Sequence, residues 1–124
     1  MSNVADNLAR LAAEIGPLLA ARGWTLATAE SCTGGLMGHA ITNISGSSAY
    51  FKGGIISYAN EVKQRLLNVP AEMLATHGAV SREVALQMAR GARAVLEADV
   101  AIAATGVAGP LGGAPIKPVG TVYV

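Results

Sequence analysis

The sequence predicts an α/β protein, in which helices pack against a layered sheet. Segments with apolar residues at helical spacing alternate with short apolar segments of strand length. Turns rich in glycine, serine, threonine and asparagine separate these segments. The chain has 124 residues, of which 52% are hydrophobic, and this is the size and composition of one folded domain. We therefore expect residues 1–124 to form a single α/β domain.

The N-terminal part of the chain predicts a helix followed by a strand. From Asn3 to about Arg22, apolar residues recur at steps of three and four, so that they line one face of a helix. Gly23 then provides a typical C-cap. The residues from Trp24 to Ala29 are apolar or threonine, which favours a strand.

A second helix and a second strand are expected next. Residues 31–35 suit a tight turn, which leads into a helix of small residues up to about Asn43. After a polar turn over residues 43–48, the residues from Phe51 to Tyr58 predict a strand.

Two cap signals mark the helices of the middle region. Asn60 suits the N-cap of a helix that begins at Glu61, and Pro70 either ends this helix or starts another short one. Ser81 suits the N-cap of a helix that runs to about Glu97, with apolar residues on one side.

The C-terminal region predicts two strands joined by a loop. Residues 99–105 are an apolar run of strand length, residues 106–118 are rich in glycine and proline, and residues 119–124 begin a further strand. A sheet strand that is buried on both faces normally needs a following element to cover it. We therefore expect this domain to lack its last C-terminal element.

Composition argues against several kinds of partner. Nine basic and eight acidic residues, without a basic run, make nucleic acid an unexpected partner. Since no stretch of about 18 apolar residues occurs, no membrane segment is expected. The single cysteine, Cys32, and the charged residues in the first segment favour a cytoplasmic location. His39 and His77 stand far apart with no carboxylate cluster between them, so neither a metal nor another cofactor is expected.

The first motif with chemical potential is AESCTGG, where a strand ends and a helix begins. Free backbone N–H groups at such a point suit an anion, and Gly34 and Gly35 allow a ligand to approach the backbone. Ser31 and Thr33 could instead only cap the helix. We expect Cys32 to be a buried small residue rather than a thiol nucleophile.

The second motif is SYANEVK, which places Lys63 in the first turn of a helix. A cation near the positive end of a helix dipole is disfavoured, and partial burial adds to this effect, so the pKa of the lysine would fall. A neutral lysine can act as a base. The alternative is a solvated lysine that pairs with Glu61.

The third motif is ATGVAGP, again at the end of a strand. Because ligands of open α/β sheets bind at the carboxyl ends of the strands, the hydroxyl groups of Ser31, Tyr58 and Thr105 could converge there. His77 could be a general base, although a loop histidine before glycine more often bonds the backbone.

Five segments, in this order, resemble the CinA C-terminal domain family: AESCTGG, YFKGGIISYANEVKQRLLNVP, HGAVS, ATGVAGP and KPVGTVYV. The resemblance covers Leu8 to Val124. It implies a three-layer α/β/α sandwich around a mixed, mostly parallel sheet. Since stand-alone family members include the PncC-type nicotinamide mononucleotide deamidases, it also implies hydrolysis of the amide of nicotinamide mononucleotide to nicotinic acid mononucleotide and ammonia, in pyridine nucleotide salvage.

The resemblance further implies a serine and lysine dyad, which falls on Ser31 and Lys63, with Tyr58 as a third catalytic residue. In the hypothesis that follows, the Ser31 hydroxyl attacks the amide carbon, and neutral Lys63 takes the proton directly or through Tyr58. Backbone N–H groups of two loops, residues 33–35 and residues 106–109, would hold the oxyanion and the phosphate. Which loop holds which group stays open. The expected substrate-binding residues are Thr33, Gly34, Gly35, Thr105, Gly106 and Gly109.

Other interpretations stay open at this point. Similar proteins carry a GPGGG run followed by TP and an acidic residue, where this chain has Leu111, Ala114 and Ile116, so the substrate contacts of that loop could differ. One alternative is a non-catalytic nucleotide-binding or regulatory domain of the competence/damage-inducible CinA type. Another is a dimerisation domain, because many small residues permit close helix packing, and a homo-oligomer is compatible with each interpretation.

Overall fold

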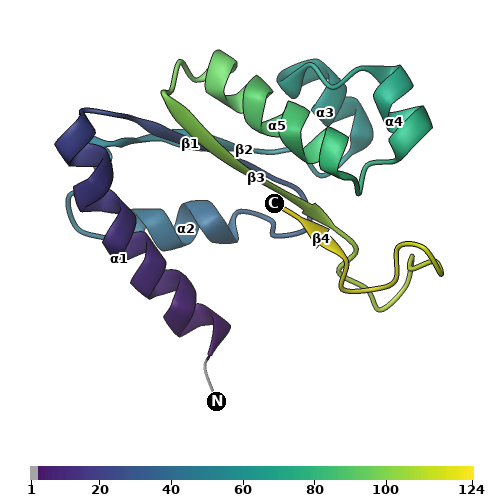
Figure 1. The fold of residues 1–124 in the computed structure, drawn as a ribbon, viewed down its shortest axis with the longest axis horizontal. Coiled ribbons are helices and arrows are strands. Elements are labelled where there is room, and N and C mark those ends of the chain that lie inside the picture. Colours follow the sequence, from purple (N-terminus) through teal and green to yellow (C-terminus); the bar gives the residue numbers. More distant parts are fainter. Residues whose placement is uncertain (1–2) are drawn as a thin grey trace.

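The computed structural model describes residues 3–124 as an alternation of helices and strands (Figure 1). The elements, in chain order, are α1 (Val4–Arg22), β1 (Leu26–Glu30), α2 (Leu36–Thr42), the 3-10 helix η1 (Ser47–Ala49), β2 (Phe51–Ile56), α3 (Asn60–Leu67), α4 (Ala71–His77), α5 (Arg82–Val95), β3 (Val100–Gly106) and β4 (Val122–Tyr123).

The four strands form one mixed sheet in the order β2-β1-β3-β4. The central strand β1 is parallel to both β2 and β3, whereas β4 is antiparallel to β3 and pairs with it only through Thr105 and Gly106. The expected mixed, mostly parallel sheet is therefore confirmed. Because β1, β2 and β3 run in the same direction, their carboxyl ends meet at one edge of the sheet.

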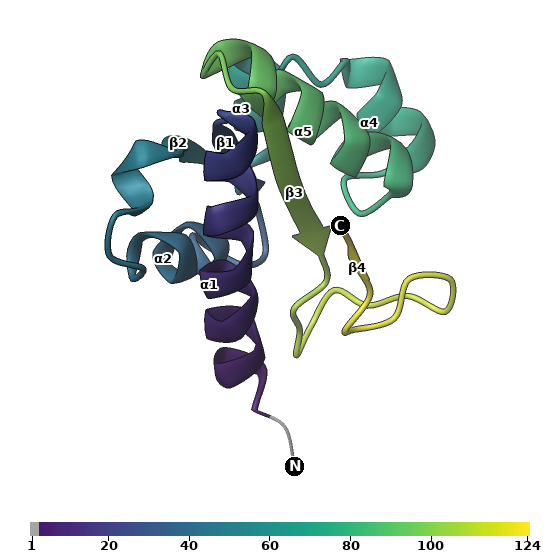
Figure 2. The same ribbon diagram turned by 60° about the vertical axis from the view of Figure 1, so that its left-hand side comes forward.

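Helices cover both faces of the sheet, as the two ribbon views show (Figures 1 and 2). α3, α4 and α5 lie on one face, and α1 and α2 lie on the other. Alternate residues of β1 serve the two sides: Ala27 and Ala29 pack with α5 around Met88, whereas Leu26 packs with Leu19 of α1. This arrangement confirms the expected three-layer α/β/α sandwich.

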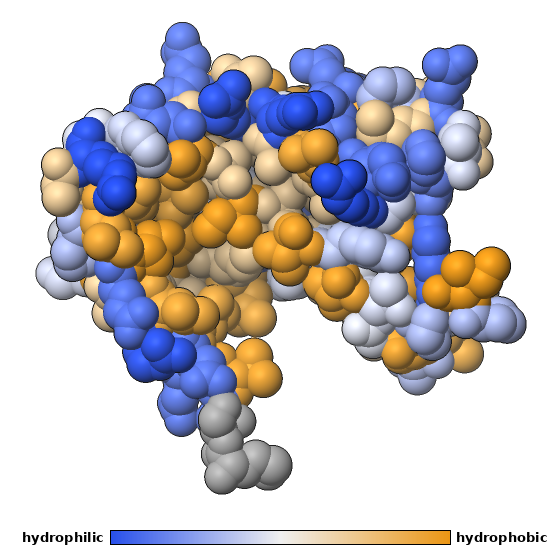
Figure 3. All heavy atoms as spheres, in the orientation of Figure 1, coloured by the Kyte–Doolittle hydropathy of each residue, from blue (hydrophilic) through white to orange (hydrophobic). Residues whose placement is uncertain are grey.

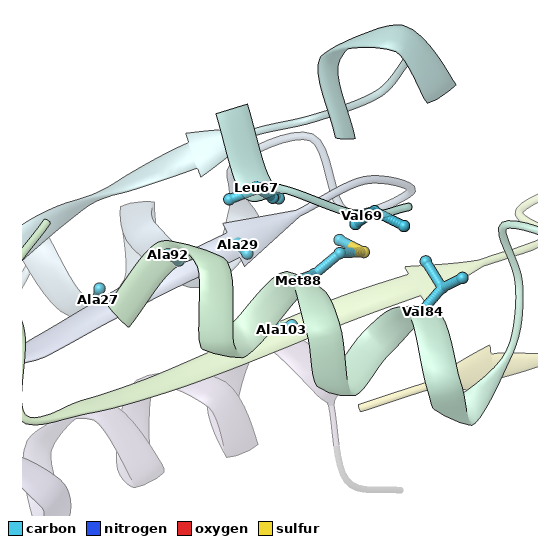
Figure 4. Packing of buried hydrophobic residues seen from close by; sticks show 8 residues of the cluster. All are labelled: Ala27, Ala29, Leu67, Val69, Val84, Met88, Ala92 and Ala103. Atoms are coloured by element: carbon cyan, nitrogen blue, oxygen red, sulfur yellow. The ribbon is translucent and has the colours of Figure 1, made fainter. Parts of the chain in front are cut away.

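The core on the α5 face is built mainly from small and aliphatic side chains (Figure 4). Met88 and Val84 of α5 are completely buried, and so is Leu67 at the end of α3. Gly91 of α5 lies against the backbone of Leu67 and lets the two helices approach closely. The position of α3 is therefore set by its packing on α5.

Several predicted helix boundaries are confirmed by their caps. The Asn3 side chain accepts a hydrogen bond from the Ala5 N–H at 2.9 Å, and Gly23 adopts a left-handed conformation with φ of 66°. The Ser81 hydroxyl accepts from the Val84 N–H at 3.2 Å, so α5 begins where the sequence predicted.

The prediction of Asn60 as an N-cap was wrong by one residue. Ala59 is the N-cap of α3, because its carbonyl already accepts from the N–H groups of Val62 and Lys63, and Asn60 is the first helical residue. Strand bounds also differ: β1 covers Leu26–Glu30 instead of Trp24 to Ala29. The Thr25 N–H donates to the Asp99 carboxylate at 2.8 Å, while the Thr25 carbonyl accepts from the N–H of Val100 at the start of β3 at 3.0 Å.

Two other strands are shorter than predicted. β2 ends at Ile56, since the chain turns at Ser57 and directs the next carbonyl groups toward α3. β4 contains only Val122 and Tyr123, because the preceding residues form turns.

Pro70 is the N-cap of the short helix α4, one of the two outcomes expected for that proline.

Apolar side chains also gather on the surface between α1 and α5, over β3 (Figure 3). A cavity of about 320 Å³ lies in this region, lined in part by Leu86, Ala103 and Tyr123. None of the predicted site residues lines this cavity.

In the part of the chain from residue 3 onward, no helix has the length and apolar character needed to cross a membrane.

Candidate functional site

Two side chains that are 32 positions apart in sequence meet at the carboxyl end of β1. Ser31 directly follows β1, and Lys63 lies in the first turn of α3, with the lysine Nζ 3.0 Å from the serine Oγ. Both residues are buried: Lys63 is 1% exposed and Ser31 is 7% exposed. The structure thus brings together the two residues expected to form a dyad.

The remaining partners of the Lys63 amine are backbone carbonyls. The Nζ lies 2.6 Å from the carbonyl oxygen of Ser57 and 3.1 Å from that of Tyr58. A charged lysine has three N–H groups, and it would donate one to each of the two carbonyls and one to the serine hydroxyl. A neutral lysine has two N–H groups for the carbonyls and one lone pair, so that the Ser31 hydroxyl donates to it. The neutral form thus has the hydrogen bond that a general base needs.

Burial lowers the pKa of Lys63 below its ordinary value of 10.5, because the charged amine loses its hydration. The electrostatic interaction with the neighbouring Cys32 acts in the opposite direction and raises this pKa, but its effect is the smaller of the two. In residues 3–124, no carboxylate forms an ion pair with Lys63. The alternative of a solvated lysine paired with Glu61 is therefore not what the structure shows.

The turn after β2 holds the lysine in place. Ser57 is fully buried, and its N–H and hydroxyl both donate to the carbonyl oxygen of Glu30, at 2.7 and 3.3 Å. Its own carbonyl is then directed toward Lys63. On the other side, the N–H of Ser31 donates to the carbonyl of Ala104 in β3 at 3.0 Å. All three parallel strands therefore contribute to the geometry of the dyad.

Glu30 is a residue of this site that the sequence analysis missed. It is 2% exposed, and its carboxylate accepts from the Thr33 hydroxyl at 2.7 Å and from the N–H groups of Met37 and Gly38, each at 2.9 Å. The available signal was an acidic residue at the end of an otherwise uncharged strand, directly before a glycine-rich helix start.

The turn after Ser31 leaves several backbone donors without an acceptor. Gly34 and Gly35 have φ angles of 62° and 109°, which favour glycine, and the Gly34 N–H donates back to the Ser31 carbonyl at 3.1 Å. Among the described residues, no acceptor faces the N–H groups of Cys32, Thr33 and Gly35. These three N–H groups have no hydrogen-bond partner in residues 3–124, whereas that of Gly34 has one.

The other two hydroxyl groups expected at the strand ends do not join the dyad. Tyr58 contacts Lys63 through its backbone carbonyl, and its side chain is 77% exposed. The Thr105 hydroxyl is buried and donates to the carbonyl of Ala79 at 2.8 Å, so it links the end of β3 to the segment before α5.

The glycine loop after β3 lies partly beside the serine turn. A Cβ atom added at Gly106 would lie 3.1 Å from the Cys32 sulfur, so the end of β3 passes close to this turn. Gly109 has a φ of 81° and precedes a cis proline. Farther along the loop, Leu111 and Ile116 are 86% and 90% exposed.

Neither of the other candidate catalytic groups contacts the lysine through a hydrogen bond. The ring nitrogen Nδ1 of His77 lies 3.6 Å from the Glu83 carboxylate. The backbone carbonyl of His77 accepts a hydrogen bond from the Lys117 amine. Cys32 is a half-buried free thiol. Within residues 3–124, no group of three or more His, Cys, Asp or Glu side chains is arranged to hold a metal ion.

Comparison with known proteins gives the family. The model of the CinA C-terminal domain matches residues 8–124. A CinA-like protein from Geobacter sulfurreducens is 58% identical over 110 residues, which are 89% of this chain and 27% of that protein. The chain thus spans about a quarter of the length of the curated relatives it matches.

Solved structures agree with this match. The competence/damage inducible protein CihA from Agrobacterium tumefaciens superimposes with a TM-score of 0.89 at 46% identity, over 98% of this chain and 74% of that chain. A competence-damaged protein (CinA) superfamily protein from Escherichia coli gives a TM-score of 0.90 at 35% identity, over 98% and 71% of the two chains. This chain belongs to the CinA C-terminal domain family.

Proposed function

We propose that this chain hydrolyses the carboxamide of nicotinamide mononucleotide, with Ser31 as nucleophile and Lys63 as general base. The observation that supports the chemistry best is the buried Lys63 amine, 3.0 Å from the Ser31 hydroxyl and otherwise bonded only to backbone carbonyls. A serine hydroxyl is a weak nucleophile unless an adjacent base takes its proton, and a desolvated lysine can do so. The substrate is proposed from the resemblance to the PncC-type deamidases.

In the proposed first half-reaction, the lone pair of Lys63 takes the Ser31 proton while the serine oxygen bonds to the amide carbon. The C=O electrons move to oxygen and form a tetrahedral oxyanion. Lys63, now an ammonium, gives its proton to the amide nitrogen as the C–N bond breaks. The products are ammonia and an ester between Ser31 and the nicotinic acid group.

In the second half-reaction, the neutral Lys63 activates a water molecule, which attacks the ester carbon. The bond to the Ser31 oxygen breaks, and the proton on Lys63 returns to this oxygen. Nicotinic acid mononucleotide leaves, and the enzyme regains its resting form. The lysine thus acts as base and then as acid in each half of the reaction.

The free N–H groups of the serine turn are the proposed oxyanion donors. They belong to Cys32, Thr33 and Gly35, and they follow the nucleophile directly. A donor of this kind lowers the barrier of acyl transfer by about 3 kcal/mol. The proposal assigns the phosphate of the nucleotide to backbone groups of Gly106 and Gly109, because the Thr105 hydroxyl already donates to Ala79.

The test is an ammonia-release assay with nicotinamide mononucleotide, nicotinamide riboside and glutamine as separate substrates. We expect ammonia from the mononucleotide, complete loss in Ser31→Ala, and a loss of about 10²- to 10⁴-fold in kcat in Lys63→Met. Ser48→Ala and Lys52→Met make the same kinds of change at exposed positions and should keep the parent rate.

Two results would contradict the proposal. Full activity in Ser31→Ala or Lys63→Met would exclude the dyad. Tight binding of the mononucleotide in calorimetry, with no ammonia released by the unmodified chain, would favour the non-catalytic nucleotide-binding function instead.

A further inference from the structure

Glu30 is a buried carboxylate that the proposed reaction does not use. It lies next to Ser31 in sequence and is 2% exposed. In the part of the chain that the structure describes, it forms no ion pair. A buried charge without a cation is costly unless several hydrogen bonds compensate for it, so the role of this residue requires an explanation.

The side chain of Glu30 gathers the serine turn and the start of α2. One carboxylate oxygen accepts from the Thr33 hydroxyl at 2.7 Å and from the Met37 N–H at 2.9 Å, and the other accepts from the Gly38 N–H at 2.9 Å. These donors lie three, seven and eight positions after Glu30 in the chain. The carboxylate therefore fixes the path of the chain on the far side of Ser31.

The backbone of Glu30 acts on the lysine through Ser57. Its carbonyl oxygen accepts from both the N–H and the hydroxyl of Ser57, and the Ser57 carbonyl contacts the Lys63 Nζ at 2.6 Å. Glu30 is thus bonded to the turn that carries the nucleophile and to the turn that holds the base. It lies on the α2 side of the sheet, opposite the face on which α3 carries Lys63.

We infer that Glu30 is a positioning residue of the dyad: its side chain fixes the turn that carries Ser31, and its carbonyl fixes the turn that orients Lys63. This inference rests on the proposed function, because it assumes that Ser31 is a nucleophile activated by Lys63. Glu30 does not touch the reacting atoms. Its effect is on the distance and direction between the serine oxygen and the amine.

Glu30→Gln separates this role from simple packing, because glutamine has nearly the same shape. The amide oxygen of glutamine can replace only one of the two carboxylate oxygens, and its NH₂ group takes the place of the other. In one orientation this NH₂ group faces the Gly38 N–H, and in the other it faces the Thr33 hydroxyl and the Met37 N–H, so a donor meets a donor in either case. The turn must then rearrange. Since a displacement of about 1 Å can reduce a rate about 10²-fold, we expect a 10- to 100-fold slower reaction at Ser31.

The reaction is measured with a fluorophosphonate: the Ser31 oxygen bonds to phosphorus, its proton passes to Lys63, and fluoride leaves. The first-order labelling rate at saturating reagent is followed by mass spectrometry of the full chain, well below its melting temperature, and the labelled residue is identified by peptide mapping. This rate refers to folded molecules and does not depend on the identity of the natural substrate. In parallel, kcat and KM are measured with nicotinamide mononucleotide.

Three variants complete the design. Glu30→Gln should label 10- to 100-fold more slowly, with kcat reduced to a similar extent and KM unchanged. Thr33→Val removes one of the three donors to Glu30 and should label about tenfold more slowly, which decides the matter if Glu30→Gln does not fold. Glu72→Gln makes the same chemical change at an exposed residue of α4 and should label at the parent rate.

The outcomes separate the two proposals. Labelling of Glu30→Gln and Thr33→Val at the parent rate would overturn the positioning role and leave the proposed function intact. If the unmodified chain neither releases ammonia from nicotinamide mononucleotide nor is labelled at Ser31, the proposed function fails, and the positioning role fails with it.

Discussion

Replacing Gly91 by alanine should move the helix that carries the catalytic lysine. A Cβ atom at this position would lie 2.7 Å from both the Cα and the carbonyl carbon of Leu67, and closer still to its carbonyl oxygen. These are backbone atoms, so no side-chain rotation relieves the contact. Because ordinary contact begins at 3.4 Å, α3 and α5 would have to separate by at least about 0.7 Å.

The expected cost follows from two opposing effects. Overpacking of a core costs about 1–3 kcal/mol, while alanine gains about 1 kcal/mol over glycine inside a helix. Because the contact is with backbone atoms, the overpacking cost lies in the upper part of this range, at about 2–3 kcal/mol. We therefore expect a net loss of about 1–2 kcal/mol in the free energy of unfolding, which corresponds to a melting temperature lower by about 4–8 °C. The contact between the Lys63 Nζ and the Ser31 Oγ, now 3.0 Å, would lengthen beyond good hydrogen-bond distance.

Two measurements check this prediction: thermal unfolding followed by circular dichroism, and ammonia release per folded molecule at a temperature well below the transition. The rate should fall about 10- to 100-fold. Gly38→Ala in α2 is the control for the melting temperature alone, since its added Cβ would find its nearest neighbour, an oxygen of the Glu30 carboxylate, at 3.4 Å. A Gly91→Ala chain that melts at the parent temperature and keeps the parent rate would refute the reasoning.

Four further predictions concern the same region. Because burial lowers the pKa of Lys63 below 10.5 and only the neutral amine accepts a proton, kcat/KM should rise with pH up to this lowered pKa and then level off. Lys63→Arg, which stays charged, should be inactive at every pH. Between the lowered pKa and 10.5, the unfolded chain binds more protons at Lys63 than the native chain does. The free energy of unfolding, measured by urea titration, should therefore rise with pH through this window, and Lys63→Met should lose that rise. Cys32→Ala should keep most of its ammonia release, because Ser31 contacts the lysine, and complete loss would instead identify a thiol nucleophile. Gly106→Ala should melt at a lower temperature and react more slowly, since its Cβ would lie 2.7 Å from the Thr121 carbonyl oxygen and 3.1 Å from the Cys32 sulfur; unchanged melting and rate would contradict this.

The elements of the fold were largely predictable from local patterns. The apolar spacing of α5 and its Ser81 cap are visible in the sequence because they depend on residues within a few positions of each other. The start of α3 was missed by one residue, because the Ala59 carbonyl, and not the Asn60 side chain, makes the first bonds of the helix. Side-chain preferences for caps are only average tendencies, and backbone bonding decides the individual case.

The candidate site was predictable in its residue types but not in its contacts. Ser31 and Lys63 lie in separate motifs, and their distance depends on the parallel pairing of β1 with β2, which no local pattern specifies. For the same reason the sequence could not show that the Thr105 hydroxyl bonds to Ala79, 26 positions away. Glu30 was missed because its three donors become neighbours only when the turn after Ser31 is folded.

The contact between an amine and a serine hydroxyl, with no carboxylate of residues 3–124 bound to either, also determines which inhibitors would remain bound. A boronic acid that bonds to the Ser31 oxygen becomes a tetrahedral anion, and the displaced proton converts the neighbouring amine into an ammonium. The adduct is then a contact ion pair shielded from water, where electrostatic attraction is strong. A reagent that leaves a neutral ester creates no such pair. Residence time on this protein should therefore depend first on the charge that an inhibitor acquires upon bonding, and only then on its shape.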